Sequence, residues 1–234
     1  RSCNERIYSK EFAEGLPETA VYLVEALGED LFHIPGNVPD NPGQLRKSSP
    51  SRTRTSSRCF TAPEAEVLVV DALTYAGDLA KLEGAASSER CRFLKADICD
   101  FAAMERAFCE FCPDTVFNLA AETHVDRSIE NPGIFVETNV LGTERLLEAA
   151  LAYLQKSSPE RRKTFVFHQI STDEVYGSLG AEGVFSEASA CRARSPYSAS
   201  KAAADALVTA WHETFGMRVV VTRSANNYGP HQHR

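Results

Sequence analysis

Glu66-Val-Leu-Val-Val-Asp71 is a short run of valine and leucine between two acidic residues. Such a run is typical of a strand that is buried on both faces of a parallel sheet. The same signature returns over 92–95, 115–119, 164–170 and 218–222, and helical spacing of apolar residues lies between, over 102–111, 133–154 and 198–215. Strands that alternate with helices predict right-handed β-α-β units. The predicted fold class is therefore α/β, a doubly wound parallel sheet with helices on both faces.

The composition excludes two broad classes of protein. The chain has 234 residues, 43% of them hydrophobic, and a formal net charge of -7. A negative balance argues against general binding of nucleic acid, which needs a basic face to displace counterions from phosphates. The sequence has no apolar run near the ~18 residues that a membrane helix requires, and Ala20–Leu27 lacks the basic start and cleavage site of a signal peptide. We therefore expect a cytoplasmic protein with no membrane partner.

The seven cysteines form an irregular set. Cys109 and Cys112 make one C-x-x-C pair, but no second pair and no histidine lie nearby at zinc spacing. The pair is a metal or redox site, or it consists of ordinary thiols in a reducing cytosol. We predict no metal site.

Residues 1–60 differ from the rest of the chain. They contain as many basic as acidic residues, so the whole net charge comes from residues 61–234. Residues 34–43 are rich in Pro, Gly and Asn, and Arg46–Arg58 is mostly Ser, Thr and Arg, compositions that bury too little apolar surface to offset the entropy of ordering. We predict an irregular or disordered segment over 1–60, with a short helix over Glu18–Asp30, and a folded domain over 61–234. The basic stretch is a solvated segment or, alternatively, an RNA-binding or targeting arm.

Residues at the carboxyl ends of the predicted strands are candidates for ligand binding, because ligands bind there in doubly wound sheets. Asp71 ends the first of these strands, where an acid accepts hydrogen bonds from an adenosine ribose and repels a 2′-phosphate, which favours NAD over NADP. Ala120 and Ala121 follow the third strand. Their small side chains let a flat cofactor approach the backbone or, equally, allow tight packing of strand against helix.

The strongest chemical signal is Tyr197-Ser-Ala-Ser-Lys201. Tyr197 and Lys201 are four residues apart, so they project from one face of the predicted helix. An ammonium beside a phenol favours the phenolate, which then accepts a proton from a substrate hydroxyl. The pair follows a strand that leads into Ser171-Thr-Asp-Glu174, whose two adjacent carboxyls serve as acid and base when their environments differ. The alternatives are a surface Tyr–Lys pair and a solvated, capped loop.

These residues also identify a family. The chain from Glu66 to Arg234 resembles the extended short-chain dehydrogenase/reductases, and most closely the dTDP-glucose 4,6-dehydratases. Tyr-x-x-x-Lys occurs throughout that superfamily, whereas Thr-Asp-Glu after the strand marks the dehydratases against the 4-epimerases. The segments that carry the resemblance are Val70-Asp-Ala-Leu-Thr-Tyr-Ala-Gly77, Ala96-Asp-Ile-Cys-Asp100, Leu119-Ala-Ala-Glu-Thr-His-Val-Asp-Arg-Ser128, Glu137-Thr-Asn-Val-Leu-Gly-Thr143, Ile170-Ser-Thr-Asp-Glu-Val-Tyr-Gly177, Pro196-Tyr-Ser-Ala-Ser-Lys201 and Asn226-Asn-Tyr-Gly-Pro230.

The resemblance implies a Rossmann-like domain that dehydrates dTDP-glucose to dTDP-4-keto-6-deoxyglucose with NAD. Tyr197 would take the proton of the C4 hydroxyl while Thr172 holds its oxygen, Glu174 would remove the C5 proton, and Asp173 would protonate the C6 hydroxyl, which leaves as water before hydride returns to C6. The resemblance implies NAD contacts from Asp71, Thr74, Asp97, Ile98, Leu119, Ala120, Ala121, Thr138, Tyr197, Lys201 and Asn227. It implies substrate contacts from Thr123, Thr172 and Asn226, and a supporting role for Asn139.

Two departures from the family pattern shape the prediction for this chain. No glycine occurs between Gln44 and Ala76, where the family has the glycine-rich turn that binds pyrophosphate. We therefore expect the first strand and this turn to be missing, with weak NAD binding and little or no turnover. The chain stops at Arg234, four residues after Pro230. We therefore expect a truncated C-terminal substrate domain, in a chain that is incomplete at both ends.

Three functions stay open on the sequence alone: a dTDP-glucose dehydratase, a dehydratase of a GDP- or UDP-linked sugar, and a non-catalytic remnant that binds a partner. The resemblance also implies a homodimer that forms through the helices predicted over 133–154 and 198–215.

Overall fold

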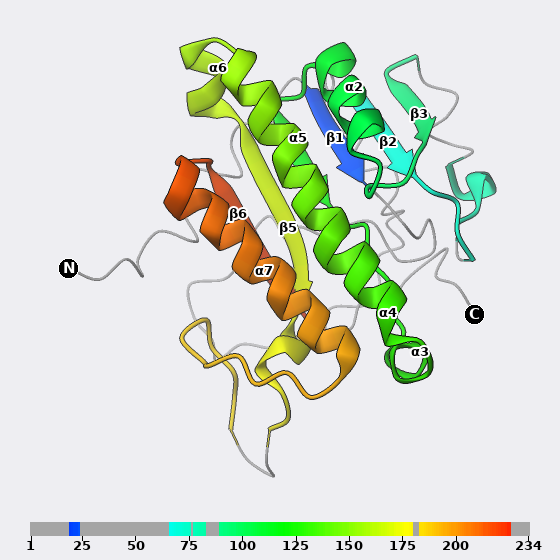
Figure 1. Ribbon diagram of the computed structural model, residues 1–234, viewed down its shortest axis with the longest axis vertical. Coiled ribbons are helices and arrows are strands. Elements are labelled where there is room, and N and C mark those ends of the chain that lie inside the picture. Colours follow the sequence, from blue (N-terminus) through cyan, green and yellow to red (C-terminus); the bar gives the residue numbers. More distant parts are fainter. Residues whose placement is uncertain (1–18, 24–65, 76, 83–88, 180–182, 226–234) are drawn as a thin grey trace, which may run out of the picture.

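The computed structural model describes residues 19–23, 66–75, 77–82, 89–179 and 183–225. Its centre is a six-stranded sheet with the strand order β3-β2-β1-β4-β5-β6, in which all neighbouring strands are parallel (Figure 1). The chain builds outward from β1 to β3 on one side and from β4 to β6 on the other, so the predicted doubly wound sheet is confirmed. The strands are β1 (Thr19–Leu23), β2 (Glu66–Asp71), β3 (Cys91–Lys95), β4 (Thr115–Asn118), β5 (Val166–Thr172) and β6 (Val219–Ser224).

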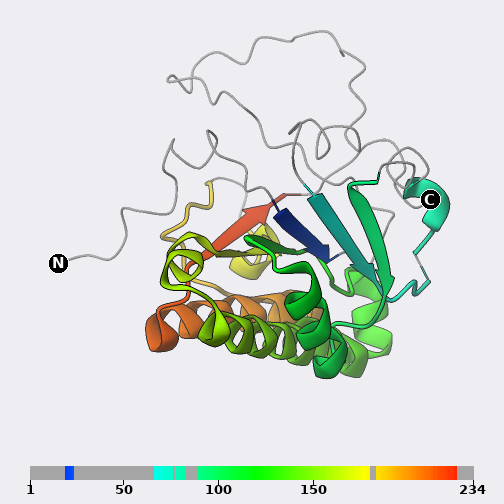
Figure 2. The same cartoon turned by 90° about the horizontal axis from the view of Figure 1, so that it is seen from above.

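The longer described helices form a layer on one face of this sheet (Figures 1 and 2). Helices on the other face were also predicted, but most of the connections from β1 to β3 lie outside the described residues. None of the described helices is long and apolar enough to cross a membrane. The helices are α2 (Phe101–Phe111), α3 (Val125–Glu130), α4 (Pro132–Phe135), α5 (Thr143–Lys156), α6 (Pro159–Thr164) and α7 (Pro196–Phe215), with the short turns η3 (Leu79–Leu82), η4 (Val136–Gly142) and η5 (Asp173–Tyr176).

The first strand is present, so the prediction that it is missing was wrong. Thr19–Leu23 forms β1 in a segment for which the sequence predicted a helix within irregular structure. In its register, Val21 is aligned with Leu68 of β2 on one side and with Val116 of β4 on the other. The physical reason is that buried backbone groups of β2 and β4 need partners, and a β-prone run supplies them on both sides. The other residues of 1–60, where the glycine turn was predicted to be missing, lie outside the described residues.

The core explains why β2 carries an unbroken apolar run. Leu68 and Val70 pack into the main cluster, which α2, α5 and α7 cover, whereas Val67 and Val69 pack on the opposite face against Leu82. Both faces of β2 are therefore buried, as its sequence predicts. Full burial of such a side chain contributes about 1.5–3 kcal/mol.

The predicted helix over 133–154 is divided into α4, η4 and α5. The middle section, η4, is π-helical, and its wider turn holds the buried side chains of Thr138 and Asn139. A π-helical turn inside a longer helix is frequent at functional sites.

β5 runs two residues beyond its predicted end at Ile170, to Thr172, so Asp173 follows the strand directly.

His168 makes the stability of this sheet dependent on pH. Its buried ring lies on β5, with Nε2 3.0 Å from the Thr222 hydroxyl of β6 and the ring centre 5.2 Å from that of Phe117. Burial lowers the pKa of His168 to about 4. Because an unfolded histidine titrates near pH 6.5, the unfolded chain binds the proton first as the pH falls.

We expect the free energy of unfolding to fall between about pH 6.5 and pH 4, by up to about 3 kcal/mol from this residue. Urea unfolding of the protein and of His168→Gln at several pH values measures the effect, and the variant should show a flatter pH dependence. His212→Gln, at an exposed position on α7, is the matched control. Equal pH dependence in the protein and in His168→Gln would refute the assignment.

Candidate active site

The carboxyl ends of β2, β3 and β4 form the first half of the candidate site. A small depression of about 10 Å³ lies where they meet. Three of its lining residues are alanines, so a flat group can approach the backbone there. The lining includes four residues predicted to contact NAD, namely Asp71, Asp97, Ile98 and Ala120.

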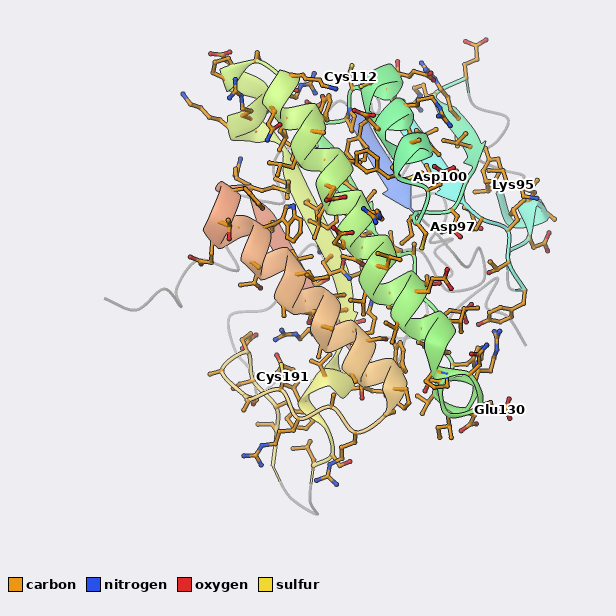
Figure 3. All side chains as sticks on the ribbon, viewed as in Figure 1. Lys95, Asp97, Asp100, Cys112, Glu130 and Cys191 are labelled. Atoms are coloured by element: carbon orange, nitrogen blue, oxygen red, sulfur yellow. The ribbon has the colours of Figure 1, made fainter. Side chains whose placement is uncertain are left out.

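Asp71 is held by the turn that follows β2. Its side chain is 1% exposed, and its Oδ1 accepts a hydrogen bond of 2.6 Å from the backbone N–H of Leu73. Leu73 has a φ of 54°, a left-handed conformation that turns the chain so that Thr74 lies on the surface. Asp97 is exposed and accepts a hydrogen bond from the N–H of Cys99. Figure 3 shows Asp97 beside Asp100, where the chain passes from β3 into α2.

The loop after β4 is fixed by one buried amide, that of Asn139 in η4. Its Oδ1 accepts from the N–H of Glu122 at 2.8 Å, and its Nδ2 donates to the Glu122 carbonyl at 3.0 Å and to the Ser200 hydroxyl at 2.8 Å. The Ser200 hydroxyl donates in turn to the carbonyl of Tyr197 at 2.7 Å. Asn139 therefore joins this loop, which carries the predicted residues Leu119, Ala120, Ala121 and Thr123, to the first turns of α7.

A cation also links the loops after β2 and β4. The guanidinium of Arg127 lies 3.8 Å from the ring centre of Tyr75, and its Nη1 is 3.5 Å from the carboxylate of Glu122, whose side chain is buried. Burial and then the negative charge of Glu122 raise the pKa of Tyr75. The sequence analysis missed this cluster because Tyr75 and Arg127 are far apart in the chain and only the fold brings them together.

The second half of the site begins where β5 ends. Thr172 is the last residue of β5, and its hydroxyl accepts a hydrogen bond of 3.2 Å from the N–H of Glu174, which caps η5. Asp173 and Glu174 thus occupy the first turn of a short helix rather than a loop. They line an open cleft of about 430 Å³ together with Gly177, Phe185 and Ala225.

Glu174 differs electrostatically from an ordinary surface carboxyl. Burial, and secondly the adjacent charge of Asp173, raise the pKa of Glu174. A carboxylate with a raised pKa is a stronger base. This direction agrees with the predicted role of Glu174 as the group that removes a proton.

Tyr197 and Lys201 lie on the first turns of α7, which packs against β5 and η5 (Figure 1). The helix starts with a capping box between Ser195 and Ser198. Tyr197 and Lys201 are 8% and 3% exposed, so they are not the surface pair considered as an alternative. Lys201 Nζ donates a hydrogen bond of 2.7 Å to the carbonyl of Ile170, near the end of β5.

The structure thus gathers the predicted residues into two groups, one around the alanine-lined depression and one around the cleft and α7. Tyr197 and Lys201 line neither hollow, and Asn226 and Asn227 lie outside the described residues. The sequence analysis missed four residues that surround the second group. They are Ser171, Tyr176, Asp205 and Arg223. A signal existed for Asp205, which lies four residues after Lys201 on the same helix face.

The C-x-x-C pair lies away from both groups. Cys109 and Cys112 are exposed at the end of α2, and Cys112 lies at the opposite end of the molecule from Cys191, near the amino ends of the strands (Figure 3). Across the part of the chain that the structure describes, no three His, Cys, Asp or Glu side chains are grouped to hold a metal ion.

The residue types in the first half of the site fit the adenosine end of a dinucleotide, because an acid at the end of β2 accepts hydrogen bonds from a ribose without a 2′-phosphate. Asp71 is 1% exposed and the depression beside it measures about 10 Å³, the size of one water molecule, so a bound adenosine requires these loops to move apart. The segment that would carry the pyrophosphate turn, between β1 and β2, lies outside the described residues.

Comparison with known proteins agrees with this geometry. Residues 58–234 match the family model described as GDP-mannose 4,6 dehydratase. The dTDP-glucose 4,6-dehydratase of Neisseria meningitidis serogroup B is 51% identical over 166 residues, which are 70% of this chain and 47% of that protein. The enzyme of the same name from Shigella flexneri is 51% identical over 174 residues, 70% of this chain and 48% of that protein. The chain spans about half the length of the curated relatives it matches.

Solved structures give the same picture. DesIV, a dTDP-glucose 4,6-dehydratase from Streptomyces venezuelae crystallised with NAD, superposes with a TM-score of 0.65 at 42% identity, over 72% of this chain and 48% of that chain. The dTDP-glucose 4,6-dehydratase of Bacillus anthracis in complex with NAD superposes with a TM-score of 0.68 at 30% identity, over 92% and 57% of the two chains.

The raised pKa of Glu174 has a consequence for stability. Because the folded chain holds this proton more tightly than the unfolded chain does, Glu174 destabilises the fold as the pH rises through its pKa. We expect Glu174→Gln to raise Tm at about pH 8 and to change it little at about pH 4, in thermal unfolding at both pH values. Glu187→Gln, in an exposed segment, is the control. A loss of stability in Glu174→Gln at pH 8 would contradict the prediction.

Proposed function

This chain belongs to the family described as GDP-mannose 4,6 dehydratase, and we propose that it carries the catalytic residues for dehydration of dTDP-glucose to dTDP-4-keto-6-deoxyglucose with NAD. The observation that carries the proposal is the open cleft lined by Asp173 and Glu174, at the end of β5 and beside the helix that bears Tyr197 and Lys201. The relatives named above, which are about half identical to this chain, support the choice of sugar nucleotide.

The proposed reaction needs proton transfers by three residues of this chain and a hydrogen bond from a fourth. The phenolate of Tyr197, favoured by the nearby ammonium of Lys201, accepts the proton of the sugar C4 hydroxyl, and the Thr172 hydroxyl holds that oxygen. The resulting ketone acidifies the C5–H bond, and the carboxylate of Glu174 accepts that proton. Asp173, in its acid form, protonates the C6 hydroxyl, which leaves as water. When bound, NAD would supply the hydride acceptor for oxidation at C4 and afterwards the hydride donor for reduction at C6. Glu174 returns to C5 the proton that it removed, which completes the 4-keto-6-deoxy product.

The cofactor-binding residues of the proposal are those of the first half of the site. Asp71 accepts hydrogen bonds from the ribose hydroxyls, and Thr74, Asp97, Ile98 and Ala120 surround the adenosine. Leu119, Ala121, Thr138 and Asn227 complete the contacts, and Thr123 and Asn226 contact the sugar nucleotide. Support comes from the position of Asp71 at the end of β2 and from the small side chains of Ala72, Ala96 and Ala120 beside it.

We also propose that two copies of the whole protein pair through α5 and α7. These helices lie side by side on the outer side of the layer (Figure 1). Leu141, just before α5, and Phe215, at the end of α7, expose 41% and 50% of their surface. Light scattering of the whole protein measures the mass, and a monomer at micromolar concentration would exclude this pairing.

The proposed activity is tested by adding dTDP-glucose, GDP-mannose or a UDP-linked glucose to the protein with NAD and following the 4-keto product. The proposed function predicts turnover of dTDP-glucose, whereas the missing glycine-rich turn predicts little or none for this chain, and the assay decides between the two. Where turnover is measured, we expect a loss of about 10³-fold or more in kcat for Tyr197→Phe and for Glu174→Gln. Faster turnover of a GDP- or UDP-linked sugar would replace the proposed substrate. Binding of no sugar nucleotide by the whole protein would favour a non-catalytic role.

Cofactor choice gives a separate prediction for Asp71. A carboxylate at this position repels a 2′-phosphate, so the protein should bind NAD more tightly than NADP. We expect Asp71→Ala to weaken NAD binding and to reduce the preference for NAD over NADP by about tenfold or more. Calorimetric titration with each cofactor measures both effects, and Asp78→Ala, in the same connection, is the control. An unchanged preference in Asp71→Ala would show that Asp71 does not contact the ribose.

A further inference from the structure

A partly buried ion pair lies beside the cleft and takes no part in the proposed proton transfers. Arg223 of β6 donates from Nε to Asp205 Oδ2 of α7 at 2.8 Å. The side chain of Asp205 is 4% exposed and that of Arg223 25%. The Ser171 hydroxyl of β5 donates to the same carboxylate oxygen at 3.0 Å.

The pair extends to the wall of the cleft through an aromatic side chain. Arg223 Nη1 donates to the hydroxyl of Tyr176 at 3.0 Å, and the guanidinium carbon lies 5.1 Å from the centre of that ring. The Tyr176 ring stacks on Phe185 with 5.2 Å between ring centres and 28° between planes. Phe185 lines the cleft, and so does Ala225, two residues after Arg223.

Three members of this network are close in sequence to a residue of the proposed reaction. Asp205 follows Lys201 by one helical turn, Ser171 precedes Thr172, and Tyr176 ends the turn η5 that starts with Asp173 and Glu174. A helix as short as η5 has little stability of its own, so its orientation is set by tertiary contacts. The hydroxyl and ring of Tyr176 supply such contacts.

The energetics favour a positioning role over a stabilising one. Burial raises the pKa of Asp205, against which the hydrogen bonds from Arg223 and Ser171 act. An ion pair with a buried partner adds little net stability compared with apolar side chains of similar size, because the carboxylate of Asp205 loses its hydration and the guanidinium of Arg223 loses most of its own. What such a pair does supply is a fixed register between the elements that carry it.

We propose that the Asp205–Arg223 pair, acting through Tyr176, is a positioning device that fixes the turn bearing Asp173 and Glu174 against the helix bearing Tyr197 and Lys201. The assignment of catalytic groups rests on the proposed function, but the positioning is testable without activity. The network also positions Phe185 in the wall of the cleft, because Phe185 stacks on the Tyr176 ring and Arg223 contacts that same ring.

The test uses carboxyl NMR titration of Glu174 in the protein labelled with ¹³C-glutamate. Tyr176→Phe removes only the hydroxyl that Arg223 contacts, and Arg223→Gln removes the whole cation. In both variants we expect Glu174 to titrate at a lower pH than in the unchanged protein, because the released turn is better solvated. The control is Arg145→Gln, which removes a half-exposed ion pair in which Arg145 Nη1 lies 2.9 Å from Glu148 Oε2. In this variant Glu174 should titrate as it does in the unchanged protein.

Unchanged titration of Glu174 in folded Tyr176→Phe overturns the proposal, and this variant decides the question if Arg223→Gln does not fold. In the whole protein with dTDP-glucose, Tyr176→Phe should lower kcat by about 10- to 100-fold with little change in KM. The two proposals fail in different ways. A shifted titration without any sugar-nucleotide turnover in the unchanged protein would leave the positioning device standing and remove the proposed function.

Discussion

The pairing of β1 on both sides is the constraint on which the rest of the structure depends. β1 lies between β2 and β4 and is paired with β2 over Thr19–Leu23 and with β4 over 20–23. An unpaired buried backbone group costs about as much as a lost hydrogen bond. The facing edges of β2 and β4 therefore need the backbone partners that β1 supplies. The ends of β2, β3 and β4 carry the first half of the candidate site, and the end of β5 leads into the second half. β1 therefore sets the spacing between the ends of β2 and β4 within the first half.

Buried polar side chains then fix the layer of helices on this sheet. Lys201 binds the carbonyl of Ile170, Asn139 binds both backbone groups of Glu122, and Asp205 binds Arg223. Apolar packing alone tolerates small shifts, whereas a buried ammonium or amide that loses its partner keeps its desolvation cost. The positions of α7 and η4 relative to the strand ends are therefore specified mainly by hydrogen bonds, although the energy that holds the layers together is mainly apolar.

The sequence predicted those parts of the fold that depend on local pattern. β2 has the predicted bounds because its burial on both faces leaves an unbroken apolar run. β1 was missed because Thr19–Leu23 and its flanks fit a helix as well as a strand, and pairing with β2 and β4 decides between them. The Thr172–Glu174 turn and the Tyr197–Lys201 pair were found because each lies within a few residues. Arg223 and Tyr176 meet only in the folded chain, so no local pattern indicates their contact.

In η5, the turn that bears Asp173 and Glu174, the free-energy cost of the proposed base arises at Glu174, whereas the stability that offsets it arises elsewhere in the fold. Burial raises the pKa of Glu174, which makes it a stronger base and at the same time makes its charged form unfavourable in the fold. η5 has only four residues, so its own contacts cannot offset the free-energy cost of the charged Glu174 side chain. The offset comes from the apolar core under α5 and α7, and the geometry comes from contacts that β6 and α7 make with the turn. In the proposed reaction, Glu174 is therefore a carboxyl whose charged form is unfavourable in the fold, and the proposed positioning contacts come from groups that take no part in that reaction.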